Sequence, residues 1–323
     1  MFSLIIPVYR NEGSLPALLD AIEGVQSRLS QPLEVVFVVD GSPDQSFEKL
    51  RTALPGRSFP SRLMAHARNF GSFAAIRTGL QAATGEYFAV MAADLQEPPE
   101  LILQFFATLE SGEADVVVGQ RASRLDPATS SMASRLFWWL YRKTINPDIP
   151  PGGVDIFGCN RLVLDALLQM RESNSSLVAQ LFWVGFRRKA ISYERQARLE
   201  GTSAWTLSKK VRYLLDSVYS FTDLPIRLLS LTGVVALVTA CLLGIAVLAS
   251  RLTHHIQLPG YTPTILVIVF FGGLNALGLG IVGEYVWRAY ENTKARPQAL
   301  VRATLTFAPA TRIQPALATS NRA

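Results

Sequence analysis

Polar residues able to bind metals, phosphates or sugars follow four apolar segments in the first third of the chain. In chain order they are Tyr9, Asn11 and Glu12, then Asp40, Gly41 and Ser42, then Arg68 and Asn69, and finally Asp94 and Gln96. The carboxylate of Asp94 and the amide oxygen of Gln96 are hard ligands suited to Mg²⁺ or Mn²⁺, and a cation held there would bind a nucleotide diphosphate. A surface turn capped by Asp94 explains this Asp-x-Gln pattern about as well, so the motif alone leaves both interpretations open.

The segments that carry these residues alternate between strand-like and helix-like patterns. Strands are expected at residues 2–9, 33–40, 62–67, 87–93 and 114–121, and helices at 14–29, 43–54, 72–84 and 99–111. This alternation predicts an α/β fold with a doubly wound, mostly parallel sheet covered by helices on both faces. Ligands of such sheets bind where strands end and helices begin, so the polar residues are expected to converge on one rim.

The sequence argues against several other classes of site. No G-x-G-x-x-G follows the first expected strand and no G-x-x-x-x-G-K-[ST] occurs, which disfavours dinucleotide oxidoreductases and P-loop proteins. The two cysteines, Cys159 and Cys241, lie far apart, so neither a disulfide framework nor a cysteine metal site is expected. Two cysteines without an expected disulfide fit a protein of a reducing compartment.

Two long uncharged segments occupy the last third of the chain. Residues 228–250 and 263–283 contain no charged side chain, and each is long enough to cross a hydrocarbon core of roughly 30 Å. Buried helices of a soluble protein are the alternative, but two such runs joined by a short polar linker favour a transmembrane hairpin. The charged fraction of 17% also lies below the roughly 25% of soluble domains.

Charge is distributed unevenly along the chain. Residues 1–120 carry 8 Lys/Arg and 14 Asp/Glu, whereas the rest carries 23 and 11, so the basic half also holds the apolar segments. This favours an anionic lipid surface over nucleic acid as a partner, with a solvated charge excess as the simpler alternative. Basic residues flank the hairpin and the loop between its helices offers only Arg251, which predicts that both termini are cytoplasmic. Met1 is followed directly by a strand-like segment, so no signal peptide is expected.

A series of motifs in a fixed order resembles the inverting family-2 glycosyltransferases. They are LIIPVYRNE, VVDGSPD, ARNFGSFAA, MAADLQEPPE, GQRASR, GGVDIFGCNR, RQARLEGTSAW and GEYVWRAYENTKARP. More narrowly, the chain resembles polyprenyl-phosphate glycosyltransferases, the group of dolichyl-phosphate mannose synthase and the two-span bacterial undecaprenyl-phosphate glucosyltransferases. The resemblance extends to about Pro297 and implies a GT-A-like nucleotide-sugar-binding domain followed by a membrane hairpin.

The resemblance also implies roles for individual residues. The nucleotide-sugar donor, with a UDP-sugar favoured, would be bound by Pro7, Tyr9, Glu12, Asp40, Arg68, Asp94, Arg198 and Ser203. Mg²⁺ or Mn²⁺ would be held by Asp94 and Gln96, and the acceptor phosphate by Arg121, Arg124, Ser134 and Arg135. Ser134 begins a segment to Lys143 whose aromatic residues, Tyr141 among them, are expected at the bilayer interface, with internal packing as the alternative.

The implied reaction is a single displacement on the anomeric carbon, with Asp94, Asp155 and Arg121 as catalytic residues. A polyprenyl phosphate is already anionic at pH 7, so positioning and charge neutralisation would carry the catalysis. Asp155 would orient the donor sugar or the acceptor, and a structural hydrogen bond at a strand end explains it nearly as well. A glycan or protein hydroxyl acceptor is the main alternative, and it would need a general base such as Asp155.

Several positions depart from the family pattern. Ala92 stands where relatives have a second aspartate, and Val39, Ser72 and Ala204 replace an aspartate and two lysines. These changes leave the identity of the donor sugar undetermined, and they also motivate a third interpretation of the protein as a non-catalytic membrane scaffold that binds a sugar nucleotide.

We expect a cytoplasmic catalytic domain at residues 1–205, an amphipathic juxtamembrane segment at 206–227, spans at 228–250 and 263–283, and a cytoplasmic tail at 284–323. The expected protein is multi-pass in the cytoplasmic membrane, with the spans as a possible site of homo-oligomer contact, and the tail is expected to be unstructured after about residue 302.

Overall fold

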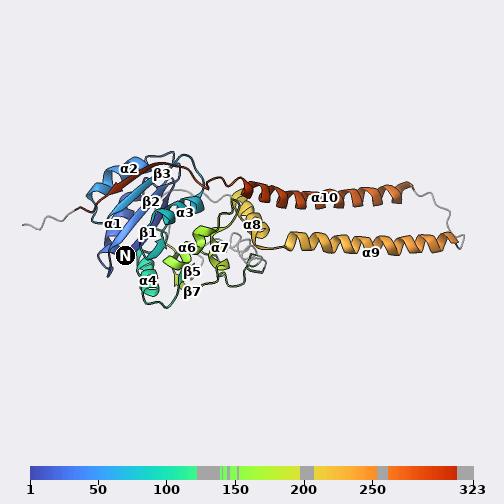
Figure 1. Cartoon of the computed structure of the whole chain (residues 1–323), viewed down its shortest axis with the longest axis horizontal. Coiled ribbons are helices and arrows are strands. Elements are labelled where there is room, and N and C mark those ends of the chain that lie inside the picture. The colour runs from blue at the N-terminus through green and yellow to red at the C-terminus, as the bar shows by residue number, and fades with distance from the viewer. Residues whose placement is uncertain are drawn as a thin grey trace, which may run out of the picture.

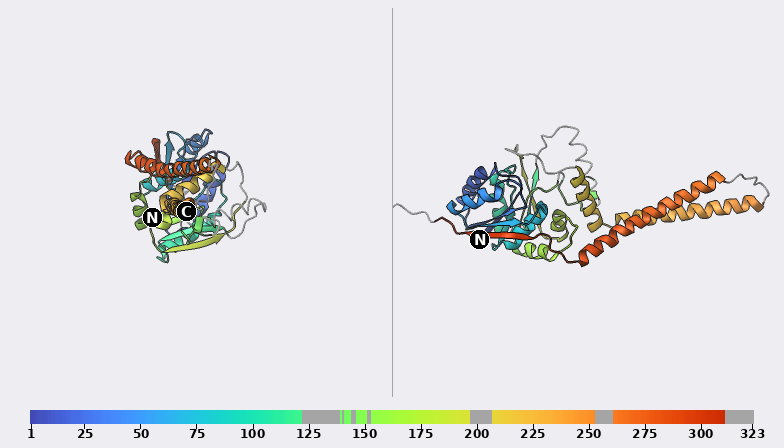
Figure 2. Two further views of the ribbon diagram at one scale, coloured as in Figure 1. Left: turned by 90° about the vertical axis from the view of Figure 1, so that its right-hand side faces the viewer. Right: turned by 90° about the horizontal axis from the view of Figure 1, so that it is seen from above.

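A computed structural model describes residues 1–121, 139, 141–143, 146–150, 153–196, 207–252 and 261–310. A layered α/β domain forms one end of the molecule, and two long helices project from it side by side (Figures 1 and 2). The described strands form one mixed sheet with the order β7-β5-β6-β4-β1-β2-β3-β8. They are β1 Phe2–Val8, β2 Leu33–Val39, β3 Ser61–His66, β4 Tyr87–Val90, β5 Val116–Arg121, β6 Phe157–Asn160, β7 Arg188–Tyr193 and β8 Val301–Phe307.

The centre of the sheet is parallel and its flanks are mixed. β1 pairs in parallel with β2 and β4, β2 with β3, and β5 with β7, whereas β6 runs antiparallel to both β4 and β5. Pairing of β1 with β4 stops at Ile5 opposite Val90, so Pro7, which cannot donate a backbone hydrogen bond, lies beyond the end of β4. The predicted doubly wound, mostly parallel sheet is confirmed.

Helices cover both faces of this sheet. The described helices of the domain are α1 Leu15–Gln26, α2 Ser46–Ala53, the 3₁₀ turn Leu54–Gly56, α3 Ser72–Ala82, α4 Pro99–Glu110, α6 Arg161–Gln169, α7 Leu177–Trp183 and α8 Leu207–Phe221. Alternate residues of a strand point to opposite faces, so Leu4 and Ile6 join the core under α1 and α4, and Ile5 joins the core under α3 and α6. Burial on both faces explains why the central strands read as continuous apolar runs.

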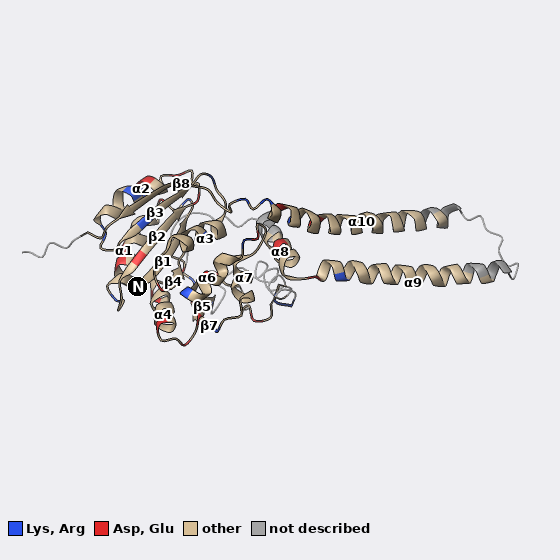
Figure 3. Ribbon diagram, in the orientation of Figure 1, with Lys and Arg blue, Asp and Glu red and all other residues tan. Residues whose placement is uncertain are grey.

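The two projecting helices match the predicted apolar segments. α9 spans Leu224–Leu252 and α10 spans Tyr261–Thr293. The stretches 224–246 and 267–293 have mean hydropathies of 2.4 and 1.7, and the most apolar part of each has no buried residue. By length and composition both are candidates to span a membrane. Away from the domain the described lengths of these helices carry almost no charged residues (Figure 3). Leu229 of α9 packs where a Cβ on Gly278 of α10 would lie 3.2 Å from it.

The expectation of an unstructured tail after about residue 302 is wrong for residues 301–307. Val301–Phe307 forms β8, which pairs antiparallel with β3 at the edge of the sheet, and Leu305 and Phe307 pack against the core under α1 and α4. The sequence VRATLTF alternates apolar and polar residues and is rich in β-branched side chains, as half-buried strands are. Residues 311–323 lie outside the described part.

The expected interfacial helix at residues 134–143 is described only at Trp139 and residues 141–143, all helical. Trp139 is exposed, and Lys143 Nζ lies 5.2 Å from its ring centroid. Tyr141 is instead fully buried, and its hydroxyl donates to Ser217 Oγ of α8 at 3.0 Å. For Tyr141 the prediction of a bilayer position is therefore wrong, because this side chain packs inside the protein against α8.

Candidate active site

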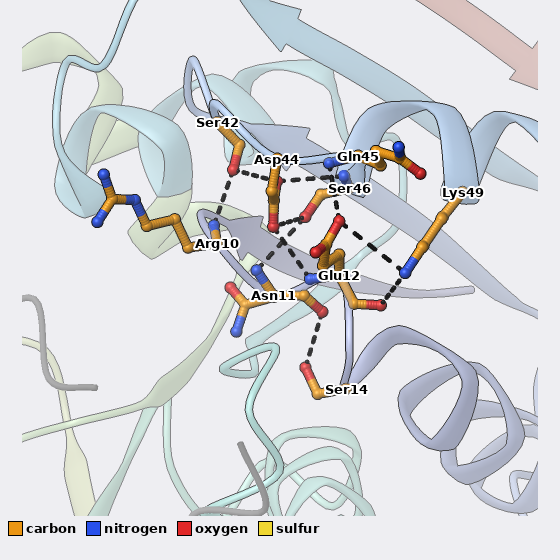
Figure 4. A network of polar contacts seen from close by, with 9 residues as sticks. All are labelled: Arg10, Asn11, Glu12, Ser14, Ser42, Asp44, Gln45, Ser46 and Lys49. Atoms are coloured by element: carbon orange, nitrogen blue, oxygen red, sulfur yellow. Dashed lines mark hydrogen bonds and ion pairs between the residues drawn. The ribbon is translucent and has the colours of Figure 1, made fainter. Parts of the chain in front are cut away.

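Side chains of the loops after β1 and β2 form a network of polar contacts at the carboxyl edge of the sheet (Figure 4). A pocket of about 340 Å³ opens between them and is lined by Arg10, Asn11, Glu12, Gly13, Ser14, Pro43 and Asp44. Parallel pairing of β1 and β2, with Val8 opposite Val39, ends both strands at the same level. The predicted convergence of the polar residues after these strands on one rim is confirmed.

Asp44 holds the two loops together. Its carboxylate accepts hydrogen bonds from Ser42 Oγ at 2.6 Å, from Ser46 Oγ at 2.9 Å, and from the backbone N–H groups of Ser46 and Glu12 at 3.2 Å each. Burial alone would raise the pKa of Asp44, but these hydrogen bonds outweigh it and hold the pKa below its usual value. Sequence reasoning missed this residue, although Ser-Pro-Asp before a helix is a recognisable turn signal.

Glu12 and Arg10 also have defined positions in this network. Glu12 Oε2 accepts from the backbone N–H of Gln45 at 3.0 Å, and Lys49 Nζ donates to the Glu12 carbonyl at 3.2 Å. Arg10 has φ of 57°, an unusual value for a side chain with a Cβ, and its N–H donates to Ser42 Oγ at 2.8 Å. Its guanidinium lies 5.4 Å from the centroid of the Tyr9 ring, which places a cation and an aromatic face beside the pocket.

Asp40 is buried at the end of β2 and is fully engaged by neighbouring groups. Its oxygens accept from the N–H groups of Phe70 at 2.8 Å and Gly71 at 2.7 Å, and one lies 2.8 Å from His66 Nδ1. Gly41, at φ of 57°, lies so close to the turn after β3 that a Cβ there would be 2.3 Å from the Arg68 carbonyl carbon. Asp40 therefore fixes the turn that presents the exposed Arg68 guanidinium, which stacks 4.1 Å from the Phe70 ring centroid.

The turn after β4 carries the predicted metal ligands. Asp94 is partly exposed, Leu95 has φ of 54°, and the N–H of Gln96 donates to Asp94 Oδ1 at 3.4 Å. Gln96 Oε1 accepts from the Arg195 guanidinium, and the backbone N–H of Gln196 donates to the Gln96 carbonyl at 2.9 Å. The segment after β7 is thus hydrogen-bonded to this turn. Asp94 caps the turn and remains partly exposed to solvent.

Glu97 and Arg195 were not predicted from the sequence, and both belong to this site. In the described part of the chain, the buried atoms Glu97 Oε2 and Arg195 Nε have no hydrogen-bond partner. Burial first, and then the negative charges of Asp155 and Asp94, raise the pKa of Glu97 to about 7, and Arg195 opposes the shift. The sequence signal that could have found Glu97 is a carboxylate directly after the Asp-x-Gln motif and before the Pro-Pro pair that begins α4.

Arg121 and Asp155 form one unit at the end of β5. Arg121 makes a bidentate contact with Asp155, with Nη2 donating to Oδ1 at 2.7 Å, and the Tyr193 hydroxyl donates to Asp155 Oδ2 at 2.9 Å. Burial and the neighbouring Asp155 carboxylate raise the pKa of Tyr193 far above its usual value, so it remains a donor. Asp155, which was predicted to orient the donor sugar or the acceptor, is therefore paired with Arg121, which was predicted to bind the acceptor phosphate.

Part of the predicted site lies outside the described residues. Arg124, Ser134, Arg135, Arg198 and Ser203 belong to this group. Among the residues that the structure describes, no group of three or more His, Cys, Asp or Glu could hold a metal ion alone. The unpartnered buried carboxylate oxygen of Glu97, close to the carboxylates of Asp94 and Asp155, nevertheless fits a site that would accept a cation in addition to Arg195, and a bound diphosphate would supply further oxygen ligands.

Comparison with known proteins decides the family. Residues 3–170 match the model for "Glycosyl transferase family 2", more than half of the chain. The chain is a family-2 glycosyltransferase. The predicted family is thereby confirmed.

Relatives of this glycosyltransferase are similar over nearly their whole length. It is 33% identical to the "Putative glycosyltransferase CsbB" of Bacillus subtilis (strain 168), over 94% of this chain and 91% of the relative. It is 29% identical to the "Prophage bactoprenol glucosyl transferase homolog" of Escherichia coli (strain K12), over 93% and 98%. It is 31% identical to the "Undecaprenyl-phosphate 4-deoxy-4-formamido-L-arabinose transferase" of Serratia proteamaculans (strain 568), over 93% and 92%. The fold is also similar to a crystal structure of glucosyl-3-phosphoglycerate synthase from Mycobacterium tuberculosis in complex with Mn²⁺, uridine diphosphate and glucosyl-3-phosphoglycerate. The match covers 69% of this chain and 80% of that chain, at 15% identity and a TM-score of 0.49.

Proposed function

We propose that this glycosyltransferase transfers a sugar from a nucleotide-sugar donor to a membrane-embedded polyprenyl phosphate such as undecaprenyl phosphate, with inversion at the anomeric carbon. The observation that carries the proposal is the similarity to bactoprenol and undecaprenyl-phosphate transferases over at least 92% of both chains, hairpin included. Two candidate membrane helices joined to the catalytic domain fit a lipid acceptor, because a phosphate in the headgroup layer is reached only by a site held at the membrane. The lipid-linked sugar would serve later transfer to cell-envelope glycans.

The donor is proposed to bind at the loops after β1, β2 and β3. Pro7, Tyr9, Glu12 and Asp40 border the nucleoside position, and the exposed guanidinium of Arg68 suits the diphosphate. Asp40 contributes by holding the turn of Arg68, since both of its oxygens accept backbone N–H groups. A UDP-sugar is the favoured donor. Arg198 and Ser203 complete this proposed set.

Asp94 and Gln96 are the proposed ligands of Mg²⁺ or Mn²⁺. Asp94 would supply an anionic oxygen, and Gln96 would supply a neutral one on releasing the Arg195 guanidinium that its Oε1 accepts from. Glu97 adds negative charge within the turn. When bound, the cation would neutralise the departing nucleotide diphosphate. Relatives commonly have a second aspartate where Ala92 stands, so Asp94 carries more of this role here.

Arg121, Arg124, Ser134 and Arg135 are proposed to bind the acceptor phosphate. The second ionisation of a phosphate monoester lies near pH 6, so the attacking oxygen is already anionic at pH 7 and needs no general base. Asp155 fits this chemistry as an orienting group, because Arg121 and Tyr193 occupy its two oxygens. In-line attack then converts an α-linked donor into a β-linked product.

The proposed topology follows the charge pattern. Arg227 lies in the first turn of α9, directly before the uncharged segment 228–250, and Arg288, Lys294 and Arg296 lie at or beyond the domain end of α10. We propose that the hairpin crosses the cytoplasmic membrane with the catalytic domain and both termini on the cytoplasmic side.

Purified full-length protein in liposomes tests the function. The wild type is expected to release nucleotide from a sugar donor only when undecaprenyl phosphate and a divalent metal are present, and to form an acid-labile, base-stable glycolipid. Glycosylation of a soluble glycan or protein hydroxyl without lipid product would replace this proposal by the alternative acceptor. Nucleotide binding with no release under any condition would favour the non-catalytic scaffold.

A further inference from the structure

The domain end of α10 is fastened to the catalytic domain through a largely buried arginine. Arg288 Nη2 donates to Asp216 Oδ1 of α8 at 2.8 Å, and its Nε donates to Glu284 Oε1 one turn earlier at 2.8 Å. Its guanidinium lies 4.9 Å from the Tyr219 ring centroid, and Nη1 donates to the Asn174 carbonyl at 3.5 Å. The Arg288 side chain is 14% exposed. These five residues, which we name the Arg288 junction, connect α8, α10 and the segment before α7.

Further contacts surround the junction and lie on the same three segments. The N–H of Ser173 donates to Asn292 Oδ1 at 3.0 Å, and Gln298 Nε2 donates to the Glu172 carbonyl at 2.9 Å. Ser220 Oγ of α8 donates to the Asn174 carbonyl at 2.6 Å. The segment 172–174 is therefore bound to α8 on one side and to the end of α10 on the other.

This segment connects in turn to the helix that begins at the proposed donor site. Arg77 of α3 is buried, and its guanidinium donates to the carbonyls of Leu168, at 3.0 Å, and of Met170, just before segment 172–174. The same helix starts after Gly71, whose N–H donates to Asp40 at 2.7 Å. Packed helices and hydrogen bonds thus join the donor-binding turn to the end of α10.

The other hairpin helix carries a contrasting ion pair. Arg227 and Asp223, at the start of α9, lie 2.8 Å apart with side chains 76% and 62% exposed, and they are neighbours four residues apart. An exposed pair of this kind contributes little to stability and connects no second element. The Arg288 junction differs because it joins separate elements in a largely buried setting, where ion pairs contribute more to fixed geometry than to net stability.

We propose that Arg288 is a positioning residue for the lipid acceptor: it fixes the catalytic domain relative to α10 so that the site at Arg121 meets the phosphate of a membrane-embedded lipid. The inference rests on the proposed function, because it assumes a lipid acceptor. A misplacement of about 1 Å between reacting groups can lower a rate about a hundredfold, so loss of the junction should impair lipid use selectively. Donor binding should change little, because Arg288 itself contacts none of the residues proposed to bind the donor.

Steady-state kinetics in nanodiscs with undecaprenyl phosphate test this role. Arg288→Ala is expected to lower kcat/KM for the lipid at least about thirtyfold while the Kd for UDP changes less than about twofold, and Arg288→Lys is expected to restore part of the loss. The matched control Arg227→Ala should stay within about twofold of the wild type in both quantities. Equal lipid kcat/KM for Arg288→Ala and wild type would overturn the inference.

A second variant and a second readout keep the test decisive. If Arg288→Ala does not bind UDP normally, Asp216→Asn removes the buried charge partner with minimal change of shape and takes its place. A fluorophore on Glu86→Cys in a Cys241→Ser background reports energy transfer to headgroup-labelled lipids, and loss of the junction should broaden its distance distribution. An unchanged distribution contradicts the positioning role. Absence of lipid product with the wild type would instead refute the proposed function, and fluorescence would still show whether the junction fixes the domain.

Discussion

The turns after β2 and β4 place acidic residues on the same edge of one sheet, but their surroundings shift the pKa values of these residues in opposite directions. The Asp44 carboxylate after β2 accepts four hydrogen bonds, and these hold its pKa below the usual value. Glu97 after β4 is buried beside Asp94 and Asp155 with an unpartnered oxygen, and its pKa is raised to about 7.

The difference distinguishes a turn that holds loops in place, at Asp44, from a turn that could bind a cation, at Glu97. The Asp44 carboxylate already accepts hydrogen bonds from four donors, so its main role is to hold the loops after β1 and β2 in place. A carboxylate that lacks donors in a site with other negative charges is stabilised by any cation that arrives, so the Glu97 turn is prepared for one. This electrostatic contrast supports the proposed position of the metal beside β4.

The largest expected effect comes from removing the exposed charge of the β4 turn. Asp94→Asn should lower turnover about 100-fold to 1,000-fold, because a neutral amide gives up several kcal/mol of charge stabilisation. Glu100→Gln at the start of α4, an exposed site paired with Arg28, serves as the control and should stay within about twofold. Glycolipid formation at saturating metal measures both, and more than about half the wild-type rate in Asp94→Asn would exclude Asp94 as the principal ligand.

Glu97→Gln should change stability in a pH-dependent way in metal-free protein. With a folded pKa of about 7 above the ordinary 4.5, the folded state binds the proton more tightly, so the wild type loses stability as the pH rises from about 4.5 to 7. The variant should match the wild type near pH 4 and be more stable by up to about 3 kcal/mol near pH 8. Thermal unfolding in detergent at the two pH values measures this, and a difference independent of pH would argue against a buried titrating carboxyl.

Asp44→Ala should weaken donor binding through its effect on the loops. The change leaves the hydroxyls and N–H groups of the network without their acceptor, which costs about 2 kcal/mol, and the Kd for UDP should rise about tenfold to thirtyfold. Titration calorimetry with UDP measures it. Asp20→Ala on α1, an exposed carboxylate facing Arg57, is the control. A Kd for UDP that Asp44→Ala leaves unchanged would show that the pocket does not depend on this network.

The smallest expected effect concerns β8. Leu305→Asn should lower the free energy of unfolding by about 1 kcal/mol, because Leu305 is only partly buried against the core. Thr304→Asn, on the exposed face of the same strand, should change it by less than about 0.5 kcal/mol. Chemical denaturation of the full-length protein compares the two, and equal effects would mean that β8 does not pack in solution as it does here.

Local patterns predicted much of this molecule. The first five strands, the helices between them and both long apolar helices follow from apolar periodicity and from uncharged length, because each such signal lies within about 30 residues. The residues at the ends of β1 to β4 could likewise be predicted, since parallel strands end at one edge.

What sequence reasoning missed depends on contacts between distant segments. β8 pairs with β3 across more than 200 residues, and its Ala/Thr-rich sequence has too weak a pattern to indicate that partner. The burial of Glu97 requires the Arg195–Gln196 segment to close over its turn, and the pairing of Arg121 with Asp155 requires β5 and the chain before β6 to come together. The pKa of a carboxyl group follows from these surroundings and has no signature in the residue itself.

β8 has a consequence for how the protein is made. The strand lies after both long helices in the chain, so the edge of β3 stays open on the ribosome while the catalytic domain and then the hairpin emerge. An open sheet edge is a template for pairing with other chains. This strand can close that edge only after both long helices have been synthesised, so the newly made domain stays exposed to aggregation and to proteases until then. The order of the elements in the chain thereby delays completion of the catalytic sheet until both candidate membrane helices have been made.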